Sequence, residues 1–162
     1  YLPNHSLSSY SASDLDSFIS INFNGKPDNS YVDENGNFIK ELDKNLSQMY
    51  NEGISYVDAQ NEYGINALLT FAVSKNESGF GRSAIAIAKN NLFGHSAYDS
   101  CPFTCATVYN TVKDSIITHS TKYMNDTYGI SDIKKIEAFT KEKYKDYSGL
   151  VIQYMFHSKR NK

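Results

Sequence analysis

Apolar residues at helical spacing between Gly64 and Glu77 constrain the fold of this chain more than any other feature. They follow the pattern i, i+3, i+4, i+7, i+8 at Ile65, Leu68, Leu69, Ala72 and Val73. This spacing places them along one side of an α-helix, where they can be buried against other elements. The sequence therefore predicts a helix that begins near Gly64 and packs against the core.

Further helices are predicted from the same periodicity and from residues that can cap a helix N-terminus. These helices follow Ser11 or Ser13, span Phe38 to Met49 with Gly53 closing the helix, cover Ser83–Lys89, and follow Thr111 and Ser131. The stretches 24–37 and 90–110 are rich in turn-forming residues and are predicted as loops, the second with at most one short hairpin. We expect one domain over residues 1–162, of a mostly α (α+β) class with at most a small β-hairpin lobe.

Composition and charge exclude several classes of protein. Hydrophobic residues make up 40% of the chain and charged residues 21%, which is typical of a folded domain rather than a disordered one. The net charge of -2 gives no reason to expect a nucleic-acid partner. The chain lacks a long apolar run and a signal-peptide pattern at its start, so neither a membrane span nor an export signal is predicted. The scattered histidines lack metal-ligand spacing, and we expect no metal and no cofactor.

The two cysteines, Cys101 and Cys105, stand in the sequence Cys-Pro-Phe-Thr-Cys. This short spacing in a loop can close a small disulfide ring or leave two thiols. In an exported protein the oxidising environment permits the bond, and we expect it there.

Glu77 is a candidate for acid–base chemistry. It stands four residues after Val73 and eight after Leu69, so a continuing helix would place its carboxyl on the buried stripe. Partial desolvation would raise the pKa of this carboxyl toward about 6, as a general acid near neutral pH requires. Gly79 and Gly81 could then admit a large ligand. The alternative is a glutamate near a helix end that bonds the backbone.

Three motifs follow one another in the middle of the chain. They are Glu77-Ser-Gly-Phe-Gly-Arg-Ser-Ala-Ile-Ala, Asn90-Asn-Leu-Phe-Gly94 and Ala97-Tyr-Asp-Ser100. In order and spacing they resemble the bacterial glucosaminidase family of peptidoglycan hydrolases, glycoside hydrolase family 73, in its autolysin-type branch. The resemblance implies a lysozyme-like helical domain with a substrate cleft. It also implies cleavage of the β-1,4 bond between N-acetylglucosamine and N-acetylmuramic acid in peptidoglycan.

The same resemblance implies a setting for the chain. Its partner would be the glycan strands of peptidoglycan, with no nucleic acid and no membrane span. It would be secreted, associated with the cell wall and monomeric, and fused to wall-binding repeats in a full-length protein.

The resemblance also implies two catalytic carboxyl groups. Glu77 matches the general acid that protonates the leaving oxygen. Asp99 matches the acid of the Ala-Tyr-Asp-Ser motif and is the second candidate. It could activate water as a base or orient the acetamide of the substrate if that group is the internal nucleophile. The alternative for Asp99 is a turn-forming residue that bonds its own backbone.

Substrate-binding roles are implied for Asn90, Asn91, Phe93 and Tyr98. For Asn90 and Asn91 the choice is between bonding substrate amides and holding a turn. For Phe93 it is between a place in the core and a platform for a sugar ring, and the core is favoured.

The C-terminal part resembles the family less well. Ser148-Gly-Leu-Val-Ile-Gln-Tyr154 is similar to the family's Ser-Gly-x-Asn-Val-Lys-Tyr, which implies that Tyr154 is the cleft tyrosine and a catalytic residue. The residues that follow lack the usual Ala-Ser-Asp-Pro continuation, so a tyrosine packed on the core is the alternative. Two other functions stay open: cleavage of the lytic-transglycosylase type, which needs one glutamate, and a peptidoglycan-binding module without turnover.

Overall fold

The computed structural model describes residues 6–127 of the chain. Its helices are α1 (Ala12–Ser20), η1 (Asn29–Tyr31), α2 (Gly53–Tyr63), α3 (Ala67–Glu77), α4 (Ala84–Lys89), α5 (Pro102–Cys105), α6 (Val112–Thr118) and η2 (His119–Thr127). η1 is a single 3-10 turn, and η2 is a π-helix that follows directly on α6. In this part of the chain β structure is limited to two isolated bridges, Gly25 with Leu46 and Val32 with Phe38. The prediction of a mostly α fold is confirmed.

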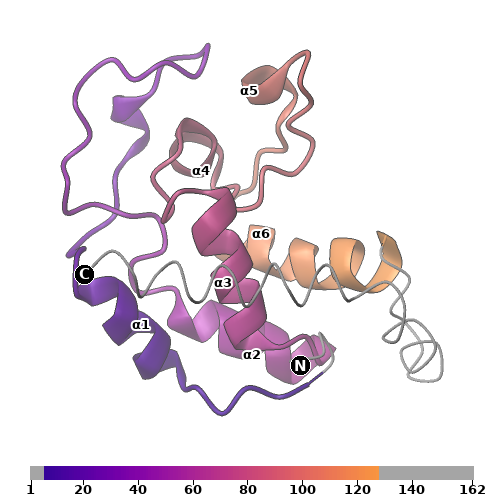
Figure 1. The fold of residues 1–162 in the computed structure, drawn as a ribbon. Helices are drawn as coiled ribbons and strands as arrows, with labels where there is room; N and C mark the ends of the chain where they lie inside the picture. Colours follow the sequence, from indigo (N-terminus) through magenta and orange to yellow (C-terminus); the bar gives the residue numbers. More distant parts are fainter. Residues whose placement is uncertain (1–5, 128–162) are drawn as a thin grey trace.

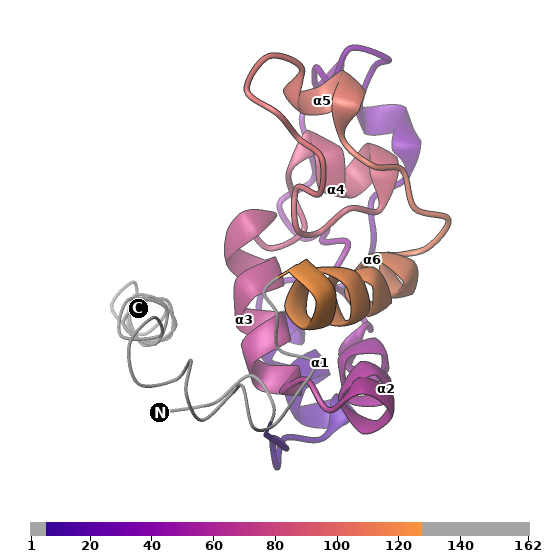
Figure 2. The same cartoon turned by 90° about the vertical axis from the view of Figure 1, so that its right-hand side faces the viewer.

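The helices divide the molecule into two parts that are visible in Figure 2. α2 packs against α1, α3 and α6, and these helices form the lower part of the view. The upper part holds α4, α5 and the long segment that joins α1 to α2 (Figure 1). α3 runs from the helical part toward α4, so its C-terminal end lies between the two parts.

The core is built around α2. Leu15 and Ile19 from α1, Tyr56 from α2 and Phe71 from α3 are buried in one apolar cluster. The Tyr56 and Phe71 rings meet edge to face, with centroids 5.4 Å apart. The Tyr56 hydroxyl lies 2.7 Å from the hydroxyl of Ser74, so the one polar atom of this ring is satisfied inside the core.

Most helices predicted from caps and periodicity are present. Ser11 caps α1 and Thr111 caps α6, each with an aspartate three residues later that completes a capping box. Asn66 caps α3 and Ser83 caps α4. The helix predicted after Ser131 lies outside the described residues.

The helix predicted from Phe38 to Met49 is wrong. This segment forms turns, and Phe38 and Ile39 are exposed at 46% and 64%. Its backbone groups bond to other parts of the chain: the Ser47 N–H donates to the carbonyl of Gly25, and the Arg82 guanidinium donates to three carbonyls between residues 43 and 46. A helix would need these same carbonyls for its own ladder, so the long-range bonds replace it.

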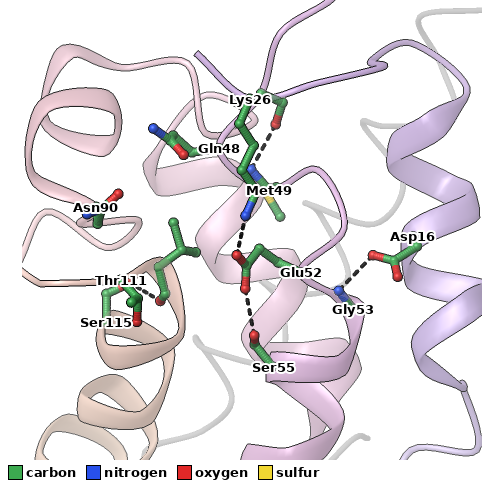
Figure 3. Close-up of polar contacts among 12 residues, drawn as sticks. Asp16, Lys26, Gln48, Met49, Glu52, Gly53, Ser55, Asn90, Thr111 and Ser115 are labelled. Atoms are coloured by element: carbon green, nitrogen blue, oxygen red, sulfur yellow. Dashed lines mark hydrogen bonds and ion pairs between the residues drawn. The ribbon is translucent and has the colours of Figure 1, made fainter. Parts of the chain in front are cut away.

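Gly53 begins α2 instead of closing a helix. A Cβ at Gly53 would lie 2.1 Å from the carbonyl oxygen of Ala12, so only glycine permits the close approach of α1. Figure 3 shows the carboxylate of Asp16 on α1 accepting the Gly53 N–H, at 2.7 Å. It also shows Glu52 paired with the Lys26 ammonium and accepting the Ser55 hydroxyl. These contacts fix the start of α2 to α1 and to the segment that precedes it.

Candidate functional site

Glu77 is the last residue of α3 and lines an open cavity. Its side chain is exposed, so the expectation of a carboxyl on the buried stripe is wrong. The reason is the orientation of α3. The helix buries Leu69, Phe71 and Ser74, whereas Val73 is half-buried beside the cavity. The carboxyl therefore stands at the rim of a hollow and is not enclosed in the core.

Ser78 and Gly81 fix the turn that follows Glu77. The Ser78 hydroxyl accepts the N–H of Gly81 at 2.7 Å. Gly81 has a φ of +69°, and an added Cβ would lie 2.9 Å from the backbone nitrogen of Met49. Gly81 therefore lets the chain pack closely on itself and is not a point of approach for a ligand. Around Gly79, in contrast, an added Cβ would meet no atom within 4 Å.

The cavity beside Glu77 has a volume of about 260 Å³. It is formed by the end of α3, the loop after α4 and the start of η2. The residues that line it are Val73, Glu77, Phe93, Gly94, His95, Ser96, His119 and Tyr123. Among these described lining residues, Glu77 is the one carboxylate. The site thus combines a single acid with a largely aromatic boundary.

Four of the lining side chains, Phe93, His95, His119 and Tyr123, form a stacked group that we call the ring wall. The Phe93 ring lies on His119 with centroids 3.9 Å apart, and the His95 ring lies on Tyr123 at the same distance. Both pairs are within 5° of parallel. Because the Phe93 ring is buried and is covered by an imidazole, it belongs to the wall rather than to a free sugar platform.

The two histidines of the ring wall are joined by hydrogen bonds. His95 Nδ1 lies 2.7 Å from the Tyr109 hydroxyl, and His95 Nε2 lies 3.2 Å from His119 Nδ1. Burial lowers the pKa of His95 to about 4, with a smaller contribution from the positive charge of Lys122. Burial also lowers the pKa of His119 to about 3. Both imidazoles are therefore neutral at neutral pH.

Asn91 shapes the loop that carries Phe93 and His95. Its Nδ2 donates to the carbonyls of His95 and Thr107, and its Oδ1 accepts the N–H groups of Phe93 and His95, at 3.0 to 3.3 Å. Its side chain is 1% exposed. All donor and acceptor positions of this amide are used inside the protein, so Asn91 holds the turn and has none left for a substrate amide.

Asn90 has a related role at the end of α4. It adopts a left-handed conformation with a φ of +53°, which asparagine tolerates better than most residues. Its Nδ2 donates to the carbonyls of Tyr109 and Asn110, at 3.1 and 3.2 Å. Asn90 therefore ties the end of α4 to the segment that leads into α6.

The segment that holds this site matches a known protein family. Residues 53–159 match the Glucosaminidase family, described as mannosyl-glycoprotein endo-beta-N-acetylglucosaminidase. The match covers Glu77, the Asn90–Gly94 loop and the whole ring wall. The chain belongs to the glucosaminidase family. Membership places it among the glycoside hydrolases.

Two curated proteins of Streptococcus pneumoniae are similar to this glucosaminidase-family chain. One comes from serotype 4 and one from strain R6, and both carry the name "Putative endo-beta-N-acetylglucosaminidase". Each is 40% identical over 96 residues, which is 55% of this chain and 14% of the pneumococcal protein. The chain thus matches only a small part of the length of these relatives.

Asp99 and Tyr98 lie on an exposed loop outside the cavity lining. Tyr98 is 63% exposed, and Asp99 is exposed as well. The structure brings Glu77 together with Phe93 and does not bring Asp99 or Tyr98 to the same cavity. Tyr154, the third expected catalytic residue, lies outside the described residues.

The end of this exposed loop is held by a disulfide and by a buried lysine. Cys101 and Cys105 are disulfide-bonded across α5, as expected, and their Cα atoms lie 5.4 Å apart. The predicted loop contains this single helical turn, and the described residues form no hairpin in it. The buried Lys89 ammonium donates to the carbonyls of Phe103, Thr104 and Ala106. A cation at these carbonyls is favourable because a hydrogen bond from a charged donor is stronger than one from a neutral donor.

His95, His119 and Tyr123 line the site but are not among the residues predicted from the sequence. A local signal existed for His95, which follows the Asn90–Gly94 motif directly. His119 and Tyr123 are four residues apart, a spacing that places two side chains on one face of an α-helix. The spacing of the histidines along the chain argues against a metal site, but it carries no information about the stacking of their rings.

Within residues 6–127, no three side chains of His, Cys, Asp or Glu gather as a metal-binding group. No helix in that range has the length and apolarity needed to cross a membrane.

Proposed function

We propose that this domain hydrolyses the β-1,4 bond between N-acetylglucosamine and N-acetylmuramic acid in bacterial peptidoglycan. One observation carries the proposal. Glu77 stands at the rim of an open cavity beside the ring wall, within the segment that matches the glucosaminidase family. The names of the pneumococcal relatives, which refer to an endo-beta-N-acetylglucosaminidase, support the same activity.

Glu77 would act as the general acid. Cleavage of a glycosidic bond requires a proton on the leaving oxygen, and a positioned carboxyl group can supply it. The cavity is open, so a polymer can reach the carboxyl from outside. The half-buried Tyr123 ring offers an apolar surface with a polar edge, which suits the faces and hydroxyls of a sugar.

The second catalytic group is also part of the proposal. Asp99 remains our candidate, as a base that activates water or as a group that orients the substrate acetamide. Because Asp99 is exposed and outside the cavity lining, it would act on a substrate that extends from the cavity over the loop. Tyr154 remains the candidate cleft tyrosine.

A lytic-transglycosylase-like reaction is a second candidate. It is favoured by the presence of one carboxylate, Glu77, among the described residues that line the cavity. A single acid can serve this reaction because a substrate hydroxyl, rather than water, attacks the anomeric carbon and closes an anhydro ring.

Digestion of purified cell walls tests the proposal. A glucosaminidase lowers the turbidity of the walls and releases fragments with a new reducing N-acetylglucosamine end, which borohydride reduction and mass spectrometry identify. Fragments that end in an anhydro sugar would favour the transglycosylase reaction. Binding to walls without new ends would indicate a binding module and overturn the proposed activity.

A cellular setting completes the proposal. We propose that the protein is secreted, acts at the cell wall as a monomer in turnover or cell separation, and carries wall-binding repeats in its full-length form.

A further inference from the structure

The His119 imidazole is buried at the border of the cavity. The side chain is 8% exposed and lies among the cavity-lining residues. Its Nδ1 is paired with His95, and its Nε2 has no hydrogen-bond partner among residues 6–127. In that range, the one fully buried side-chain nitrogen or oxygen without a partner is Ser120 Oγ. Because Nδ1 is bonded to His95, Nε2 is the nitrogen of His119 that is left to face the cavity that the residue lines.

The hydrogen bonds behind His119 determine which of its nitrogens carries the proton. The Tyr109 hydroxyl lies 2.7 Å from His95 Nδ1. A phenol is a stronger hydrogen-bond donor than a neutral imidazole N–H, and an imidazole nitrogen is a stronger acceptor than a phenol oxygen, so Tyr109 donates its proton to His95 Nδ1. A neutral imidazole carries one proton, so His95 holds it on Nε2 and donates it to His119 Nδ1. His119 must then carry its proton on Nε2. The chain of bonds ends in an N–H donor that points to the cavity.

The ring wall holds this donor in place. The Phe93 ring covers a face of His119, with centroids 3.9 Å apart and planes 5° from parallel. His95 is fixed in turn by Tyr123, which lies on its ring, and by Tyr109. A donor fixed by packing on its face and by a bond on its far nitrogen loses little entropy when it binds an acceptor.

We propose that His119 binds substrate by donating its Nε2–H to the acetamide carbonyl oxygen of an N-acetylated sugar. This inference rests on the proposed function, because it places the sugar in the cavity beside Glu77. An acetamide carbonyl is a pure acceptor and matches a fixed donor. A free amine at the same position would be an ammonium group, which offers only donors. His119 therefore makes the site selective for N-acetylated glycan over de-N-acetylated glycan.

Two variants of His119 separate the cavity-facing nitrogen from the inner one. His119→Gln can place its side-chain N–H near the position of Nε2, whereas His119→Asn is shorter and can replace only the inner contact with His95. Both variants are made in a Glu77→Gln background, which slows turnover by about 10²-fold or more and removes the carboxylate charge that would attract an ammonium sugar. Thermal unfolding confirms that each variant folds.

The probes are a tetrasaccharide of N-acetylglucosamine and the same tetrasaccharide without its acetyl groups, with Kd measured by calorimetry. We expect the Glu77→Gln parent to prefer the acetylated probe at least tenfold, since a buried donor left unpaired costs about one to two orders of magnitude. His119→Asn should reduce this preference to less than threefold, and His119→Gln should recover at least part of it. An unchanged preference in His119→Asn, or no binding of either probe by the parent, overturns the inference.

Side-chain nitrogen NMR gives an independent readout. Both His95 and His119 should be in the Nε2–H form, and the His119 Nε2 signal should shift when the acetylated tetrasaccharide is added. A proton on Nδ1 of His119 would overturn the inference, because Nε2 could not then donate.

The failure of this inference differs from the failure of the proposed function. If the enzyme cleaves walls but its His119 variants keep the parent's preference for the acetylated tetrasaccharide, only the role of His119 is refuted. If the protein binds walls without cleaving them, the proposed hydrolase activity is refuted, but the selectivity that depends on His119 can still be observed.

Discussion

His95 Nε2 lies 3.2 Å from His119 Nδ1, and this bond joins the loop after α4 to the start of η2. The two residues come from elements that approach each other only in the folded chain. Their contact closes one side of the cavity that Glu77 lines. The stability of the site should therefore depend on the protonation of these imidazoles.

We expect the free energy of unfolding to fall as the pH is lowered from about 6.5 toward 4. Burial holds the pKa of His95 at about 4 and that of His119 at about 3, below the ordinary value of 6.5. Below pH 6.5 the unfolded chain takes up protons that the folded imidazoles do not, so stability is complete above this pH and is lost below it. The loss approaches about 1.4 kcal/mol per pH unit for each imidazole.

Urea unfolding at several pH values between 7.5 and 5 measures this slope. The His119→Gln variant, which has one imidazole fewer in the wall, should show a shallower slope over the same range. A wild-type stability that does not change from pH 7.5 to 5 would contradict the prediction.

Glu77→Gln should lower the rate of wall cleavage by about 10²- to 10⁴-fold. The amide keeps the shape of the side chain and removes the proton donor, and general acids typically contribute this much. Because Glu77 is exposed, the melting temperature should stay close to that of the wild type. Glu34→Gln is the matched control, since Glu34 is an exposed glutamate outside the cavity lining, and its rate should be unchanged. Activity of Glu77→Gln within threefold of the wild type would end the assignment.

Asp99→Asn should lower kcat at least tenfold while wall binding changes less than twofold. A charge that faces the developing cation stabilises the transition state more than the bound substrate. Sedimentation with purified walls measures binding, and release of reducing ends measures the rate. If binding and rate fall together, Asp99 is a structural residue of its loop.

Lys89→Met should reduce the free energy of unfolding by about 1–3 kcal/mol, because the carbonyls of Phe103, Thr104 and Ala106 lose a common buried donor. Lys113→Met is the comparison. Lys113 pairs with Asp58 on the surface, at 2.7 Å, and a surface pair of this kind contributes about 0–1 kcal/mol. Chemical denaturation of both variants tests the difference, and equal effects would show that the buried ammonium has no special role.

Replacing both Cys101 and Cys105 with serine should lower the free energy of unfolding by about 2 kcal/mol or less. The disulfide closes a very short ring, and the entropy that a cross-link removes from the unfolded chain grows with ring size. Intact mass after alkylation without reductant establishes the bond in the purified protein. Two added alkyl groups would show that it is absent.

Local signals were sufficient to predict several helices. Ser11 with Asp14 and Thr111 with Asp114 cap helices in the way their spacing predicts, because a capping box involves residues within one turn. The helix ending at Glu77 follows from apolar periodicity for the same reason. The segment from Phe38 to Met49 also has helical periodicity, but Arg82 and Gly25 bind its backbone from distant positions. These long-range hydrogen bonds compete with a helix, and a pattern of neighbouring residues cannot reveal them.

The sequence by itself determined the mostly α fold, the position of Glu77 at the end of its helix and the family motifs around it. Only the tertiary structure decided that the Glu77 carboxyl is exposed and that the Asn91 side-chain amide forms its hydrogen bonds within the loop. It also decided that His95, Tyr109 and His119 form one chain of hydrogen bonds. Capping and periodicity act between neighbours along the chain, and so they can be read from it. The ring wall is formed by side chains that are distant along the chain and become buried against one another. Their contacts form only when the helices pack.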